Sequence, residues 1–201
     1  NINASDADLD ALIYSNTGSE ISISGGGLLA FAVAPDYETK SSYTTTVTVS
    51  DGLNQLTENI TIDITNLNDN PTNFTTSATF SANENQSSIG TVVATDADTQ
   101  SLTYSISGSE LAITSVGVLS FVDTPDYETK SSYSATVTAS DGVNSGSQDI
   151  SVSVIDVNDN SPVFTSETTF SIPENQLEIG SVSTTDADDG NTITYSVNNS
   201  V

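Results

Sequence analysis

The stretch Ile150-Ser-Val-Ser-Val-Ile155-Asp-Val-Asn-Asp-Asn160 joins two patterns. Its first six residues alternate apolar and hydroxyl side chains, which is typical of a β-strand with one buried face. Its last five residues gather carboxylates, side-chain amides and backbone carbonyls with no lysine or arginine beside them. Ca²⁺ prefers such hard oxygen ligands and takes roughly six to eight of them. The stretch therefore predicts a strand that ends in a calcium-binding linker.

The sequence repeats itself at a spacing of 90 residues. The shared motifs are Asp-Ala-Asp at Asp6, Asp96 and Asp186, Pro-Asp-Tyr-Glu-Thr-Lys-Ser-Ser-Tyr at 35–43 and 125–133, and Asn-Asp-Asn at 68–70 and 158–160. About half of the positions are identical when residues 1–70 are aligned with 91–160. A period of this size predicts tandem domains. We expect residues 1–70 to form a domain lacking its first strand, 71–160 a complete domain, and 161–201 the N-terminal part of a third.

The complete repeat alternates with a period of two almost throughout, which indicates half-buried strands. The expected strands are 80–82, 90–95, 102–106, 111–113, 118–122, 133–139 and 150–155. A helix fits only as a short turn over 126–130. About seven short strands without a helical pattern predict an all-β sandwich.

Composition restricts the function. The net charge is −25, from 27 acidic residues against two lysines, and the chain contains no Cys and no His. Nucleic acid and anionic membranes are therefore poor partners, because binding them requires Lys and Arg. Without Cys or His, and with no base beside a Ser or Thr in a recognisable motif, we expect no enzyme. Scattered acidic residues usually form a solvated surface, whereas many of these acids cluster in short motifs, which favours metal cations. No apolar run is long enough to span a membrane.

These motifs, in this order and spacing, resemble those of the cadherin repeat family along the whole chain. The resemblance implies tandem seven-stranded Greek-key β-sandwiches of the immunoglobulin-like, cadherin type, stacked end to end with up to three Ca²⁺ ions at each junction. The family usually has Leu-Asp-Arg-Glu where this chain has Pro-Asp-Tyr-Glu, so the acids are kept and the Arg is not.

The resemblance also implies two sets of metal ligands. For the second junction they are Glu84, Asp126, Glu128, Asp156, Asn158, Asp159, Asp186 and Asp188, with the carbonyls of Val157 and Asn160. For the first junction they are Asp36, Glu38, Asn66, Asn68, Asp69, Asp96, Asp98 and Asp141, with the carbonyls of Leu67 and Asn70. Asp141, which precedes a glycine, is also a turn signal by itself.

Three departures from the family pattern bear on function. Asn66 replaces the first Asp of the linker, the family's Gly-x-Asn occurs only as Gly190-Asn191, and the chain has no Trp. The missing Trp argues against adhesion by the vertebrate strand exchange.

We expect a calcium-rigidified stalk or filament segment of an extracellular surface protein, prokaryotic in origin. Its partners would be calcium and adjacent domains of the same array, with like chains as a further possibility. The alternative is a module that recognises carbohydrate or a domain on another cell.

The two ends of the sequence hold parts of the repeat. We expect them to be completed either by continuation of a covalent array, which is the simpler case, or by strands donated from a neighbouring chain.

Overall fold

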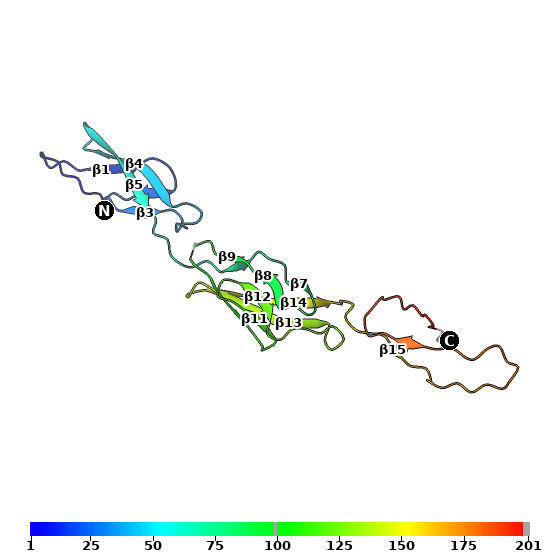
Figure 1. Ribbon diagram of the computed structural model, residues 1–201. Helices are drawn as coiled ribbons and strands as arrows, with labels where there is room; N and C mark the ends of the chain where they lie inside the picture. The colour runs from blue at the N-terminus through cyan, green and yellow to red at the C-terminus, as the bar shows by residue number, and fades with distance from the viewer. Residues whose placement is uncertain (99, 199–201) are drawn as a thin grey trace. The chain divides into compact units, whose positions relative to one another are not determined.

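The computed structural model describes residues 1–98 and 100–198 and contains strands and turns, with no helix among these residues (Figure 1). The chain divides into two compact units, Asn1–Asn70 and a second that begins at Pro71. Each unit is described by itself.

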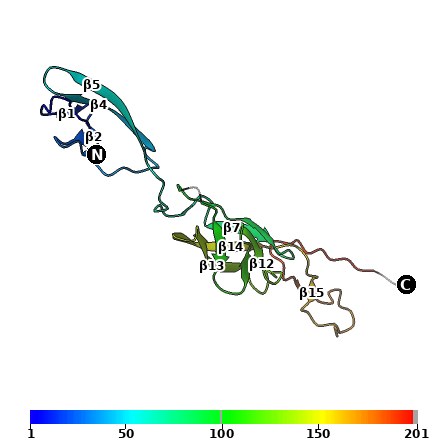
Figure 2. The same cartoon turned by 90° about the vertical axis from the view of Figure 1, so that its left-hand side faces the viewer.

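The first unit holds two small antiparallel sheets. One has the order β1-β4-β5, from β1 (Ile13–Asn16), β4 (Ser42–Ser50) and β5 (Gln55–Asp63). The other pairs β2 (Ile21–Ile23) with β3 (Leu29–Phe31). Ile21 and Val47 are buried, and the long β4–β5 hairpin is visible in Figure 2.

The second unit opens with a sandwich, as the alternating sequence predicts. Its four-stranded sheet has the order β10 (Thr103–Ile106), β13 (Ser132–Ser140), β14 (Ser145–Ile155), β7 (Thr79–Asn83). The three-stranded sheet has the order β11 (Leu111–Ile113), β12 (Val118–Phe121), β8 (Ser88–Thr91). Leu119, Val137 and Val152 are fully buried in the core of this sandwich, which confirms the all-β prediction.

Two predicted strands are wrong in their extent. The strand predicted at 150–155 begins at Ser145, because residues 145–149 also pair with β13. The segment 90–95 alternates as one strand in sequence, but the structure divides it into the end of β8 and a separate β9 (Ala94–Thr95). Between them Val92 is buried while Val93 is 43% exposed, and the Val92 N–H donates to the Gly117 carbonyl at 2.8 Å. The chain changes partner here, because β8 pairs with β12 whereas β9 pairs with β6 (Asn73–Phe74).

The chain after the sandwich has only one strand pair in the described part. Val163–Phe164 (β15) pairs with Thr184–Thr185 (β16) in the register that Asn73–Phe74 and Ala94–Thr95 show 90 residues earlier. Val163 and Phe164 are more than 60% exposed.

Candidate metal centre

Two neighbouring strands bring the first carboxylates together. β7 runs parallel to β14 in a register that sets Asn83 opposite Ile155. The next residue on each strand is an acid, Glu84 and Asp156, and the Glu84 N–H donates to the Ile155 carbonyl at 3.1 Å. Strand pairing alone therefore places a carboxylate from the start of the repeat beside one from its end.

Glu84 is held rigidly in this position. It is 3% exposed, and its two carboxylate oxygens each accept a backbone N–H at 2.8 Å, Oε1 from Val157 and Oε2 from Tyr127. These bonds tie the linker and the Pro-Asp-Tyr-Glu turn to the same carboxylate. Glu84 thus fixes the parts of the chain that carry Asp156 and Glu128.

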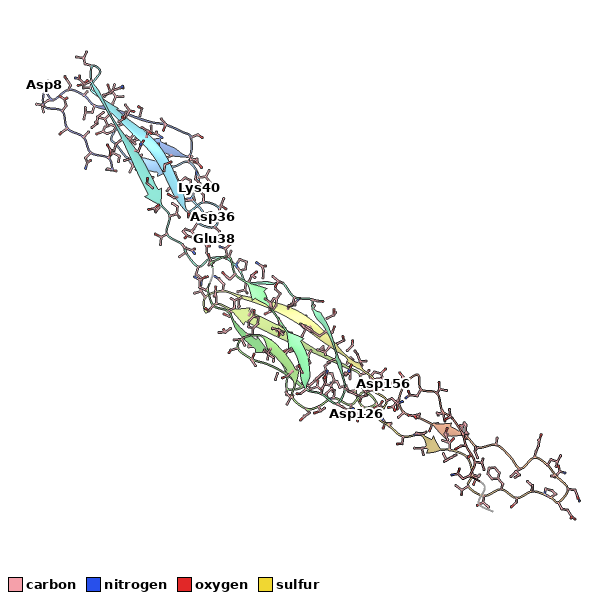
Figure 3. All side chains as sticks on the ribbon, turned by 45° about the horizontal axis from the view of Figure 1, so that its top comes forward. Asp8, Asp36, Glu38, Lys40, Asp126 and Asp156 are labelled. Atoms are coloured by element: carbon pink, nitrogen blue, oxygen red, sulfur yellow. The ribbon has the colours of Figure 1, made fainter. Side chains whose placement is uncertain are left out.

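The acidic side chains form two groups that share Glu128. Carboxylate oxygens of Glu84, Glu128 and Asp156 lie within 4.8 Å of one another, and so do those of Glu128, Asp159 and Asp188. Figure 3 shows Asp126 and Asp156 at the end of the sandwich from which the chain continues toward β15.

No protein cation balances these groups. The chain has two lysines and no arginine, and Lys130 forms an ion pair with Glu110, while Lys40 forms one with Glu20 at 2.6 Å. In the part of the chain that the structure describes, Asp156 Oδ1 is buried and accepts no hydrogen bond. A buried carboxylate oxygen without a partner is costly, and an oxygen-seeking cation such as Ca²⁺ would satisfy it. The residues present therefore fit the metal.

The pKa of the Glu128 carboxyl is raised above its ordinary value. A hydrogen bond with its own backbone lowers the pKa, but loss of hydration, a hydrogen bond with Asp126 and the negative charges of Glu84 and Asp188 together outweigh it. The pKa of Asp126 is lowered, chiefly by the hydrogen bond from the Thr129 hydroxyl at 2.9 Å. Crowding of like charges thus perturbs the residue that both groups share.

Residues after the linker close the other side of the centre. Asp188, 6% exposed, accepts from the Asn160 N–H at 2.9 Å and from the Asn160 side-chain amide at 2.8 Å. The amide of Asn158 donates to Asn191 Oδ1 at 3.0 Å. These bonds join the linker to the loop that follows β16.

Two residues of this centre, Tyr127 and Asp189, are not among the predicted ligands. The Tyr127 hydroxyl donates to Asp189 Oδ2 at 3.1 Å, and the Asp189 N–H donates to Asp156 Oδ2. The hydrogen bond and the charge of Asp189 raise the pKa of Tyr127 above its ordinary value. The replacement of Arg by Tyr in the Pro-Asp-Tyr-Glu motif was the signal in the sequence.

Of the acids predicted for the second junction, Asp126 and Asp186 lie outside the two groups. Asp126 accepts from the Thr129 N–H and hydroxyl, and Asp186 Oδ1 accepts the Asp188 N–H at 3.2 Å. Both carboxylates therefore stabilise turns. Their role as ligands, like that of Asn158 and of the Val157 and Asn160 carbonyls, stays a prediction.

The ligands predicted for the first junction are divided between the two units. Within the first unit, Asp36 Oδ2 accepts the Thr39 hydroxyl at 2.9 Å, repeating the Asp126 turn, and the linker residues Asn66, Leu67, Asn68, Asp69 and Asn70 follow β5. Glu38 lies in the same turn as Asp36.

Within the second unit, Asp98 is 2% exposed and its N–H donates to Asp96 Oδ1 at 2.9 Å. Asp141 Oδ1 accepts the Val143 and Asn144 N–H groups in the β13–β14 turn. The ligand roles at the first junction stay predictions.

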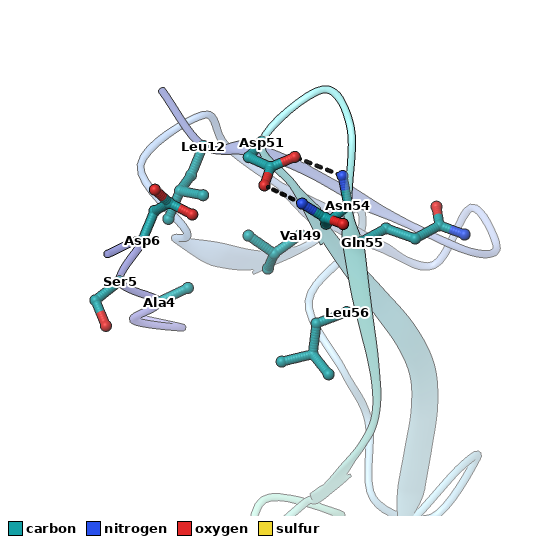
Figure 4. A pocket seen from close by; sticks show the side chains of 9 residues that line it. All are labelled: Ala4, Ser5, Asp6, Leu12, Val49, Asp51, Asn54, Gln55 and Leu56. Atoms are coloured by element: carbon teal, nitrogen blue, oxygen red, sulfur yellow. Dashed lines mark hydrogen bonds between the residues drawn. The ribbon is translucent and has the colours of Figure 1, made fainter. Parts of the chain in front are cut away.

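A small pocket of about 190 Å³ in the first unit contains the counterparts of two of these residues. Asp6 and Asp51, which correspond to Asp96 and Asp141, lie on opposite sides of it (Figure 4). Asp51 Oδ1 accepts the N–H groups of Asn54 and Leu53 at 2.6 and 2.7 Å, and these bonds lower its pKa. Two carboxylates supply few of the oxygens that one Ca²⁺ needs, so the pocket by itself is not a complete metal site.

Comparisons with known proteins concern the sequence and the fold of the chain. No protein-family model matches the chain. Cadherin EGF LAG seven-pass G-type receptor 2 of Mus musculus is 36% identical over 165 residues, which cover 74% of this chain. Cadherin-related family member 2 of the same species is 41% identical over 96 residues, or 45% of this chain. The chain spans only 6% and 7% of the lengths of these relatives.

Solved structures give the same result for the fold. Protocadherin gammaB7 EC3-6 superposes with a TM-score of 0.78 at 24% identity, over 92% of this chain and 53% of that structure. Mouse cadherin-23 EC22-24 superposes with a TM-score of 0.68 at 25% identity, over 90% and 66%. This chain is therefore built of cadherin-like domains.

Proposed function

We propose that this chain is a segment of an extracellular array of cadherin-like domains that Ca²⁺ makes rigid. The array consists of a domain within 1–70, a complete domain at 71–160 and the beginning of a third at 161–201. The domains themselves are non-enzymatic. Their function is mechanical, as a stalk or filament that holds a surface protein away from a cell.

The observation that carries the proposal is the presence of two clusters of acidic side chains, which share Glu128, at the end of the complete sandwich. Five acids from the sandwich, the linker and the following loop converge there without a protein cation. The proposed ligands at this junction are those that the resemblance implies, with Glu84, Glu128, Asp156, Asp159 and Asp188 supported by their proximity. Ca²⁺ bound here supplies positive charge that carboxylates on both sides share, and up to three ions would occupy each junction.

Electrostatics then decides the stiffness of the junction. The Debye length at physiological salt is about 8 Å, longer than the 4.8 Å within which the carboxylate oxygens of each group lie. Repulsion among the metal-free carboxylates is therefore weakly screened and weakens, without abolishing, the hydrogen-bonded contacts between the linker and the loop that carries Asp188. Bound metal reverses the sign of this interaction and fixes the linker.

The comparisons support an extracellular setting, since the relatives named above are cadherins and a receptor with cadherin in its name. No helix capable of crossing a bilayer occurs in the parts of the chain that the structure describes. A prokaryotic origin stays a prediction from the Pro-Asp-Tyr-Glu motif and the similarity of the repeats, and the relatives named above with a printed species are from mouse.

Small-angle scattering of the chain tests the proposal. Raising Ca²⁺ from chelator-buffered conditions to a few millimolar should increase the maximum dimension and reduce the spread of conformations, with a midpoint of order 10⁻⁴–10⁻³ M, as in extracellular modules. Mg²⁺ at equal concentration is the control for ionic strength. Identical scattering with chelator and with Ca²⁺ would contradict the proposal.

A recognition role is the second candidate. The protocadherin gammaB7 structure named above is described as a cis-dimer, which supports association of this chain with like chains. Sedimentation equilibrium in Ca²⁺ separates the two roles, because a strut stays monomeric across the micromolar range whereas a recognition module that binds its own kind dimerises.

A further inference from the structure

Tyr127 contacts the metal centre through both its backbone N–H and its side-chain hydroxyl. Its ring packs against the buried core of the complete sandwich, and its N–H donates to Glu84 at 2.8 Å. Its hydroxyl reaches Asp189, 62 residues further along the chain, at 3.1 Å. Core packing explains the position of the ring, but it does not require a hydroxyl group.

Asp189 connects Tyr127 to Asp156, a member of the first cluster of acids. Its side chain accepts from Tyr127, and its N–H donates to Asp156 Oδ2. The other oxygen of Asp156 is the buried one with no hydrogen-bond partner among the described residues. A continuous set of contacts therefore runs from Glu84 through Tyr127 and Asp189 to Asp156.

Only the second junction has both the tyrosine and the aspartate in its sequence. Pro-Asp-Tyr-Glu occurs in both repeats, so Tyr37 is the counterpart of Tyr127. The Asp-Ala-Asp motif is followed by Asp189 in the third repeat but by Thr99 in the second. The first junction accordingly has the tyrosine without the acid that would accept its hydroxyl.

We propose that Tyr127 is a positioning residue for Ca²⁺ at the second junction, acting through Asp189 to orient Asp156 before the metal binds. The inference rests on the proposed function, because it assigns a role within the same centre. A ligand that is already oriented loses less conformational freedom on binding, so affinity increases without an added ligand. The hydroxyl of Tyr127 needs no contact with the ion.

The test is a double-mutant cycle in the complete chain, with Tyr127→Phe, Asp189→Ala and the double variant. Ca²⁺ titrations are followed by the amide NMR signals of Val157 and Gly190, which report the second junction specifically. Tyr127→Phe keeps the ring and should weaken Ca²⁺ binding about 3- to 10-fold, the effect of losing one hydrogen bond of ordinary net strength. In the Asp189→Ala background the same substitution should have no further effect.

Three controls separate positioning from a structural effect. Tyr37→Phe should leave the second junction unchanged. Asp189→Asn, which keeps an oxygen acceptor, should recover part of the affinity lost in Asp189→Ala. The melting temperature of Tyr127→Phe in chelator should fall by no more than the loss of one hydrogen bond explains, because the core contacts of the ring are retained.

Unchanged affinity in Tyr127→Phe, or additive effects in the cycle, would overturn the inference while leaving the proposed function intact. Absence of Ca²⁺ binding to the unmodified chain would overturn both.

Discussion

Glu84 lies beside Asp156 because Asn83 and Ile155, the residues before them, are partners in the parallel β7–β14 pair. The core of the sandwich fixes these strands through Ala82, Val152 and Val154, all buried. The separation of the two carboxylates is therefore determined by apolar packing. Removing the metal does not remove the packing, so like charges stay close together in the metal-free chain.

Glu84→Gln should affect both folding and metal binding. The substitution removes a buried charge and places an amide N–H₂ where two backbone N–H groups need an acceptor. We expect a loss of about 1–3 kcal/mol in the free energy of unfolding of the complete domain in chelator, measured by urea denaturation, and weaker Ca²⁺ binding. Glu174→Gln is the matched control, since Glu174 has the same Glu-Asn-Gln context and is exposed. Equal effects of the two substitutions would contradict the role given to Glu84.

The linkers should exchange their metal affinities when their first residues are exchanged. Asn66 offers a neutral oxygen where Asp156 offers a charged one, and ligand charge tunes Ca²⁺ affinity. In calorimetric titrations of the complete chain, Asn66→Asp should tighten binding at the first junction and Asp156→Asn should weaken it at the second. If Asn66→Asp leaves the titration unchanged, position 66 is not a ligand.

The raised pKa of Glu128 predicts a pH dependence in chelator. The folded chain holds the Glu128 proton more tightly than the unfolded chain, because loss of hydration, the hydrogen bond with Asp126 and the charges of Glu84 and Asp188 together outweigh the hydrogen bond with its own backbone. The resulting stability is fully present below the ordinary pKa of this group and is lost as pH rises through the raised value. Ca²⁺ binding should show the reverse trend and weaken as pH falls, since the metal competes with this proton.

Glu128→Gln provides the comparison for the pH experiment. Thermal melts at several pH values should show a flatter dependence in this variant than in the unmodified chain. Parallel curves for the two proteins would exclude Glu128 as the source.

Gly117→Ala should destabilise the complete domain more than Gly108→Ala. Both glycines have positive φ, 88° and 82°, which strains any other residue. A Cβ at Gly117 would also lie 2.2 Å from the Val92 carbonyl oxygen, whereas at Gly108 nothing lies within 4 Å. We expect a loss of about 1 kcal/mol at Gly108 and clearly more at Gly117 in urea denaturation. Similar losses would mean that the backbone moves to accept the Cβ.

The sequence predicted the strands well where side-chain alternation determines their extent. It predicted them poorly where pairing with a partner strand determines it. The alternation in β13 and in residues 150–155 of β14 is long enough to be recognised in isolation, and the apolar residues of this alternation face the core as expected. The first five residues of β14, 145–149, were missed because they carry no apolar side chain. The break after Thr91 was missed because a change of partner strand leaves the alternation intact. A two-residue strand such as Asn73–Phe74 carries no periodic signal.

The candidate centre shows the same distinction. The acids of both groups could be predicted because they recur in motifs at a fixed period. The contact between Tyr127 and Asp189 could not, because it joins residues far apart in sequence through a turn and a loop whose approach depends on the folded sandwich.

The contacts of the two lysines affect how readily a trypsin-like protease can cleave the folded chain. A trypsin-like protease cleaves after Lys or Arg, and this sequence offers it only the bonds after Lys40 and Lys130. Each ammonium group is held by a glutamate and lies 4.4 or 4.5 Å from a tyrosine ring centroid. The next carbonyl, of Ser41 or Ser131, accepts a backbone hydrogen bond at 2.9 Å. A trypsin-like protease needs an extended segment with the lysine side chain inserted in its pocket, whereas the fold engages both lysine side chains and the backbone beside them, so the folded chain should resist cleavage of this specificity.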